Sequence, residues 1–82
     1  MTSKVYSVRA EWDGDACVWV ATSDDVPGLA TEAGTFDGLV EKLRVMIPEL
    51  LEANGILPAS EAASASFRVS AERVERDLAA FR

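Results

Sequence analysis

A run of apolar residues at helical spacing, between residues 36 and 51, constrains this chain more than any other feature of its sequence. The apolar members recur at i, i+3, i+4 and i+7, and they are Phe36, Leu39, Val40, Leu43, Ile47, Leu50 and Leu51. This spacing predicts one amphipathic helix that must bury its apolar side against another element. Thr35 is the predicted N-cap, and Gly55 is predicted to end the helix in the left-handed conformation. Pro48 lies inside the run and predicts a bend.

Two strand-like segments precede the helix and offer a surface for it. Residues 4–12 alternate between apolar and polar side chains, which is typical of a strand with one covered face. Residues 16–23 are apolar on both faces, which is typical of a central strand. Between them, Asp13 and Gly14 predict a tight hairpin because glycine accepts a positive φ.

Asp24, Asp25, Pro27 and Gly28 predict a corner between the second strand and a short third strand at residues 29–31. Proline sets φ at the first position of a type II turn, and glycine supplies the positive φ of the second. Adjacent aspartates on an extended segment point to opposite faces, so they seldom bind one ion together. The spacing of a calcium-binding loop is also absent. We therefore interpret these residues as a structural corner.

The remainder of the chain completes one small domain, residues 1–82. Residues 58–66, rich in alanine and serine, predict a flexible loop. The alternation in residues 67–72 predicts a fourth strand, whereas residues 74–82 fit a helix or a frayed strand. The expected fold class is α+β: an antiparallel three- to four-stranded sheet with one amphipathic helix packed on one face, in the order β-β-β-α-β.

The residue inventory argues against catalysis. The chain has no histidine, so the commonest general base and the commonest metal ligand are both missing. Its one cysteine, Cys17, cannot form an internal disulfide, and it is predicted to be an inert small hydrophobe in the middle of a strand. We predict no catalytic residue, no cofactor and no metal site, and hence a protein that is not an enzyme.

Charge and hydropathy restrict the partners. The net charge of −6 argues against direct binding of nucleic acid, which requires a basic face, and it permits a basic protein partner. No run approaches the roughly 18 apolar residues of a membrane span, and the first residues do not lead into the apolar core of a signal peptide. We expect a cytoplasmic protein without membrane contact.

One helix covers one face of a sheet, yet the predicted central strand is apolar on both. If the hairpin loop has two or four residues, Tyr6, Val8, Trp12 and Trp19 share a face, whereas a three-residue loop reverses that register. With the helix on the other face, these four side chains form an exposed patch of the kind that marks a protein interface. The opposite packing leaves valines exposed instead. Because apolar surface remains in both cases, we expect a homodimer.

The segment WDGDACVWVATSDDVPGLATEAGT, residues 12–35, resembles the HicB-like antitoxin superfamily, and most of all its short stand-alone branch labelled a domain of unknown function. The resemblance covers residues 4–55. It implies a binding module that neutralises a small basic HicA-like toxin, which cuts messenger RNA. Longer relatives carry a C-terminal DNA-binding segment, of which this chain has no convincing copy, and Gly38 stands where relatives tend to have an acidic residue. The alternative is an orphan self-associating domain that acts as a scaffold or binds a small ligand.

Overall fold

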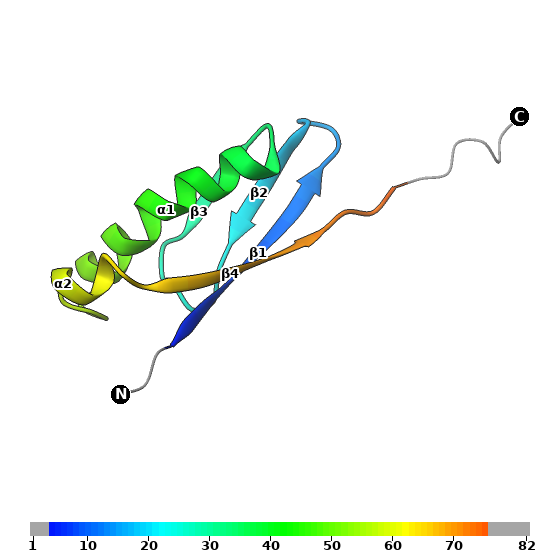
Figure 1. The fold of residues 1–82 in the computed structure, drawn as a ribbon. Coiled ribbons are helices and arrows are strands. Elements are labelled where there is room, and N and C mark those ends of the chain that lie inside the picture. Colours follow the sequence, from blue (N-terminus) through cyan, green and yellow to red (C-terminus); the bar gives the residue numbers. More distant parts are fainter. Residues whose placement is uncertain (1–3, 76–82) are drawn as a thin grey trace, which may run out of the picture.

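The computed structural model describes residues 4–75, which form a four-stranded sheet with one long helix across one face (Figure 1). The elements in chain order are β1 (Val5–Asp13), β2 (Val18–Thr22), β3 (Ala30–Ala33), α1 (Phe36–Ala53), α2 (Ala59–Ala62) and β4 (Ser66–Glu72). The fold class is therefore α+β with one main helix, as predicted.

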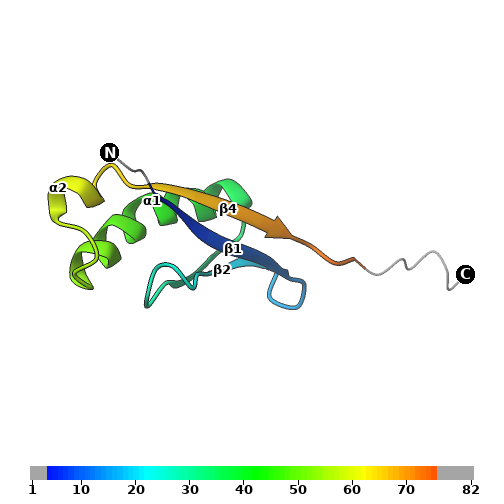
Figure 2. The same ribbon diagram turned by 90° about the horizontal axis from the view of Figure 1, so that it is seen from below.

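The sheet is mixed, so the prediction of an antiparallel sheet is wrong for its last strand. The strand order is β3-β2-β1-β4, with β2 antiparallel to both of its neighbours. β4 runs parallel to β1, and the two lie side by side in both views of the fold (Figures 1 and 2). The physical reason is the crossover. β3 runs in the direction of β1, α1 brings the chain back to the end where β1 begins, and β4 can then only repeat that direction.

The core lies between α1 and the face of the sheet that contains Tyr6 and Val8. Four residues of α1 are fully buried in it: Leu39, Leu43, Ile47 and Leu51. Under the helix, Ala10 of β1 pairs with Ala21 of β2, and both are 0% exposed. Because neither alanine carries more than a methyl group, the helix can approach the centre of the sheet closely.

The start of α1 is set by Thr35. Its Oγ1 accepts a hydrogen bond of 3.0 Å from the backbone N–H of Gly38, and Asp37 places a negative charge in the first turn. A Cβ atom at position 38 would lie 2.9 Å from Thr35 Oγ1. Glycine at this position therefore leaves room for the cap.

The end of α1 is a Schellman motif. Gly55, with φ of 69°, donates its N–H to the carbonyl oxygen of Glu52 at 3.0 Å, and Ile56 donates to that of Leu51 at 2.9 Å. Between the caps the helix continues through Pro48 without a break. The four buried side chains before and after the proline stabilise the helix more than the missing backbone hydrogen bond weakens it.

Residues 58–66 contain a helical turn, α2, so the prediction of a flexible loop is wrong for this part of the segment. Pro58 precedes α2, and its carbonyl oxygen accepts hydrogen bonds from Glu61 and Ala62 at 3.0 and 2.9 Å. Ala62 is only 1% exposed and belongs to the core. A turn of four residues is too short to show a helical stripe, which is why its composition alone indicated a loop. Residues 74–82 were predicted to form either a helix or a frayed strand. Most of them, residues 76–82, lie outside the described residues.

The hairpin between β1 and β2 has a four-residue loop, residues 14–17, which pairs Trp12 with Trp19 on one face. The positive φ of this loop belongs to Cys17, at 57°, and Gly14 has none, so the predicted role of the glycine is wrong. The loop is held instead by Asp13, whose Oδ1 accepts hydrogen bonds from two backbone N–H groups of the loop at 3.1 and 3.2 Å.

The left-handed conformation of Cys17 predicts a stabilising substitution. A side chain in this conformation is strained, whereas glycine adopts it freely and loses part of the gain through its greater unfolded-state entropy. We expect Cys17→Gly to raise the free energy of unfolding by about 0.5–1 kcal/mol in urea titrations. Cys17→Ala, which keeps the Cβ atom, is the matched control and should leave stability nearly unchanged. Equal stability of the two variants would contradict the assignment.

The anchoring of α2 predicts a contrast between neighbouring alanines. Ala62 is buried and Ala63 is exposed. We expect Ala62→Glu to lower the free energy of unfolding by roughly 2–4 kcal/mol, because a carboxylate without a partner would enter the core. Ala63→Glu should change it by less than about 0.5 kcal/mol. Similar denaturation midpoints for the two variants would mean that α2 is not packed as described.

Candidate functional site

One face of the sheet carries α1, and we call the opposite face, which carries no described helix, the open face. Along β1 the side chains on the open face are exposed, and those directed at α1 are buried up to Ala10. The strand registers extend this alternation to the other strands. The open face comprises Val5, Ser7, Arg9, Glu11 and Asp13 of β1, Val18, Val20 and Thr22 of β2, Ala30 and Glu32 of β3, and Ser66, Arg68, Ser70 and Glu72 of β4.

Three glutamates lie in one row across the open face. Glu11 is the register partner of Glu72 in β4 and of Val20 in β2, and Val20 is the partner of Glu32 in β3. We call Glu11, Glu32 and Glu72 the acidic row. All three side chains are exposed. Neighbouring strands lie about 4.8 Å apart, so three strand spacings extend the row over roughly 14 Å.

Two arginines lie beside the acidic row on the open face. Arg9 is the partner of Ser70 and of Thr22, and Arg68 is the partner of Ser7. Within residues 4–75 neither guanidinium forms an ion pair. The face therefore presents negative and positive groups in separate rows, the hydroxyl groups of Ser7, Thr22 and Ser70 lie in the same rows as the arginines, and the guanidinium groups are available to a partner.

The corner at residues 23–28 is attached to β1 by side chains that replace a strand. The pairing of β1 with β2 ends at Arg9 and Thr22, so the backbone of Ser7 has no partner in β2. Asp25 Oδ2 accepts a hydrogen bond from the N–H of Ser7 at 2.8 Å, and Ser23 Oγ donates one to its carbonyl oxygen at 2.6 Å. The corner thus satisfies the backbone groups that the end of the strand would leave unpaired.

The other side of the corner enters the core. Val26 and Leu29 are buried at 0% and 5% exposure, and they flank Pro27 and Gly28 at the turn. Leu29 donates its N–H to the carbonyl oxygen of Val26 at 3.2 Å, and Gly28 has φ of 83°, as a type II turn requires. The side chain of Asn54 donates to the carbonyl oxygen of Pro27 at 3.2 Å and so connects the turn to the end of α1. This corner is structural.

A shallow polar hollow of about 330 Å³ lies between the corner and the open face. It is lined by Ser7, Val8, Arg9, Thr22, Ser23, Asp24, Asp25 and Ser70. Exposed Asp24 belongs to its wall, whereas the carboxylate of Asp25 is already engaged by the backbone of β1. Hydroxyl groups, one guanidinium and the carboxylate of Asp24 are therefore the groups that the hollow offers to a small molecule.

The predicted exposed aromatic patch is wrong, because α1 packs on the face that contains it. Tyr6 and Val8 are buried at 4% and 2% exposure. Trp19 is half-buried, and its ring contacts those of Trp12 and Phe36 edge to face, with centroids 5.5 and 5.6 Å apart. These side chains are therefore part of the packing under the helix.

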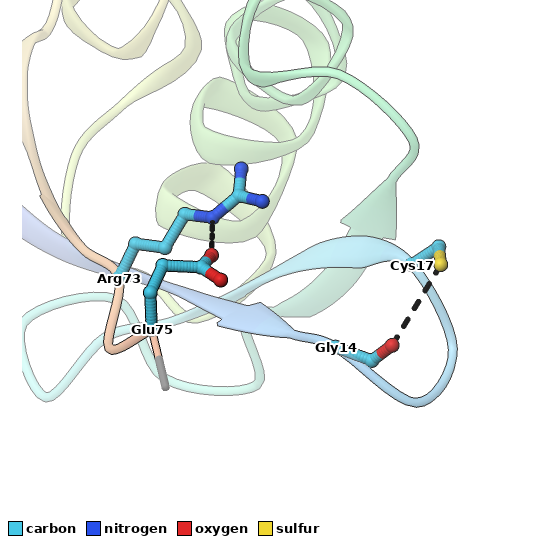
Figure 3. A network of polar contacts seen from close by, with 4 residues as sticks. All are labelled: Gly14, Cys17, Arg73 and Glu75. Atoms are coloured by element: carbon cyan, nitrogen blue, oxygen red, sulfur yellow. Dashed lines mark hydrogen bonds and ion pairs between the residues drawn. The ribbon is translucent and has the colours of Figure 1, made fainter. Parts of the chain in front are cut away.

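The outer member of this aromatic group contacts the segment after β4. Trp12 is half-buried, and the guanidinium of Arg73 lies 4.3 Å from the centroid of its ring. Arg73 also forms an ion pair with Glu75 (Figure 3). A cation–π contact thus joins the segment after β4 to the outer side of the aromatic group.

Cys17 is exposed in the hairpin loop and does not lie in the middle of a strand as predicted. Its Sγ donates a weak hydrogen bond of 3.7 Å to the carbonyl oxygen of Gly14 (Figure 3). The sequence signal failed because the apolar pattern of β2 continues through Ala16 and Cys17, whereas the strand itself begins at Val18.

In the part of the chain that the structure describes, no three carboxylate or cysteine side chains converge as ligands for a metal ion. Nor does any helix among residues 4–75 have the length and apolarity needed to cross a membrane.

The acidic row could not be identified from the sequence. The alternation in residues 4–12 and 67–72 indicates that Glu11 and Glu72 each face away from the apolar side of their strands. Their proximity depends on the parallel pairing of β1 with β4, which joins residues 61 positions apart in the chain. Only the register of three strand pairs brings Glu32 into the same row.

Comparisons with known proteins agree with this fold. The crystal structure of hypothetical protein TTHA1013 from the extremely thermophilic bacterium Thermus thermophilus is similar, with a TM-score of 0.67 and 47% sequence identity over 92% of this chain and 99% of that chain. No curated protein matches the chain. The model of a family described as "Domain of unknown function (DUF1902)" matches residues 5–80. The chain therefore belongs to the DUF1902 family.

Proposed function

We propose that this chain is a non-catalytic protein-binding module, a HicB-like antitoxin that neutralises a small basic HicA-like toxin in the cytoplasm. The resemblance of residues 12–35 to that superfamily supports this proposal. The net charge of −6 suits a basic partner, and the lack of histidine favours binding over catalysis.

The observation that carries the proposal is the acidic row on an uncovered sheet face. Glu11, Glu32 and Glu72 present three exposed carboxylates over roughly 14 Å, which matches the footprint of a few lysine or arginine side chains on a partner. A toxin that binds RNA needs a basic surface to contact phosphates. A carboxylate row that covers this surface would compete directly with the RNA.

Arg9 and Arg68 make the recognition directional. They lie on the same face as the acidic row but in different rows, so a partner with only positive groups would match one part of the face and be repelled by the other. Like charges placed opposite each other disfavour wrong partners and wrong orientations. The face therefore suits a partner that has a basic patch with an acidic group beside it.

The second candidate function is that of an orphan self-associating domain that acts as a scaffold or binds a small ligand. The polar hollow of about 330 Å³ favours it, since Arg9 and the hydroxyl groups of Ser7, Thr22 and Ser70 line one space. The guanidinium and the hydroxyl groups can bind a small anion on the side of the hollow away from the carboxylate of Asp24. Its volume lies at the lower end of the range of small-molecule sites.

The antitoxin proposal predicts that a small basic protein encoded beside this chain stops cell growth, and that co-expression of this chain restores it. We expect the two proteins to co-purify, and binding to weaken as salt is raised, because the contacts involve exposed charges. Glu11→Lys and Glu32→Lys should each weaken the affinity by roughly tenfold, as expected when an attraction becomes a repulsion. Glu49→Lys, an exposed change on α1, is the matched control and should bind nearly as well as the wild type.

Two results separate the candidates. If the neighbouring basic protein neither binds nor loses toxicity on co-expression, the antitoxin proposal is wrong. In that case a thermal shift with inorganic phosphate that disappears in Arg9→Gln would support a small-anion site in the hollow. If all three charge reversals weaken the complex equally, the partner recognises net charge and not the open face.

A further inference from the structure

β4 presents an unprotected edge. It is the outermost strand beyond β1, and in the described part of the chain no strand or side chain is bonded to its other side. The opposite edge differs, because β3 has four residues and the carbonyl oxygen of Glu32 accepts a hydrogen bond of 2.6 Å from Lys42 Nζ. β4 has seven residues, without lysine or proline. Long edges of this kind template pairing with another strand.

We propose that a second copy of this chain pairs with β4 in antiparallel orientation about a two-fold axis that passes midway between the Ser70 residues of the two copies. In this register two residues of the two strands lie opposite each other when their residue numbers add up to 140. Arg68 then lies opposite the partner's Glu72, and symmetry repeats the pair. The strand is self-complementary in charge because its arginine and its last glutamate are placed symmetrically about Ser70.

The charges inside one protomer favour this partner. Glu72 is the register neighbour of Glu11, and like charges side by side repel. Within residues 4–75 neither carboxylate has an ion-pair partner, and Arg68 has none either. The pairing places a guanidinium from each protomer beside the acidic pair of the other. A register centred on Val69 would instead place Arg68 opposite a serine and lose both ion pairs.

The helix side of β4 is compatible with the same arrangement. A groove of about 370 Å³ separates β4 from α1, and half-buried Val40, Phe67 and Val69 contribute to its lining. The two-fold axis is perpendicular to the sheet, so both α1 helices lie on one side of an eight-stranded sheet. Val69 then meets the partner's Ala71, and the two grooves adjoin at the centre of the dimer. Dimer formation would therefore cover apolar surface beside β4 that α1 leaves open in one protomer.

Charge exchange on the full chain tests the dimer. In sedimentation velocity over a concentration series, we expect a reversible dimer of the wild type with micromolar affinity, as is typical of a contact of modest area. Arg68→Glu and Glu72→Arg should each raise the dissociation constant roughly tenfold or more, since two attractions become two repulsions. The double variant R68E/E72R should dimerise like the wild type. An equimolar mixture of the two single variants should form a heterodimer, because both charged cross-strand pairs then join groups of opposite charge.

The outcomes decide the proposal. A wild type that stays monomeric throughout the series overturns it, and so does a single variant that dimerises as well as the wild type. If both single variants lose the dimer but neither the double variant nor the mixture restores it, the proposed register is wrong. Far-ultraviolet circular dichroism establishes that the variants are folded. The dimer does not depend on the antitoxin proposal, because its test changes Arg68 and Glu72, whereas that of the toxin changes Glu11 and Glu32.

Discussion

The packing of α1 on Ala10 and Ala21 is the contact on which the rest of the structure depends. The two alanines face each other across β1 and β2, and fully buried leucine and isoleucine side chains of the helix lie above them. In a domain of 82 residues this is the main source of buried apolar surface. It also decides which face of the sheet is covered. Tyr6 and Val8 therefore become core, whereas Val5, Val18 and Val20 lie on the open face among charged and hydroxyl side chains.

The corner and the caps hold the helix in this place. Ser23 and Asp25 bond the backbone of β1 where β2 has ended, and Asn54 connects the same corner to the end of α1. A segment with two adjacent aspartates thus serves as the connection between sheet and helix. The carboxylate of Asp25 accepts a hydrogen bond from a backbone N–H of β1, which is a structural role.

An architecture with one helix leaves two surfaces without cover, and they differ in chemistry. The open face has charged and hydroxyl side chains and suits a partner of complementary charge. The edge of β4 offers backbone groups and a self-complementary pair of charges, which suits a second copy. The two surfaces share the carboxylate of Glu72, which the dimer would pair with Arg68 of the other copy, whereas Glu11 and Glu32 take no part in the pairing of the two β4 strands. A protomer can therefore pair with its copy and still present Glu11 and Glu32.

The sequence by itself determined the local features: the limits of α1 with Thr35 and Gly55, the turn at Pro27 and Gly28, and the strands on either side of the hairpin. Each depends on interactions between residues close together in the chain. The covered face, the direction of β4 and the acidic row were decided only by the tertiary structure. The second strand is apolar on both sides, so its pattern could not choose a face for the helix. The row joins strands that meet through registers set by long-range pairing, which no local pattern records.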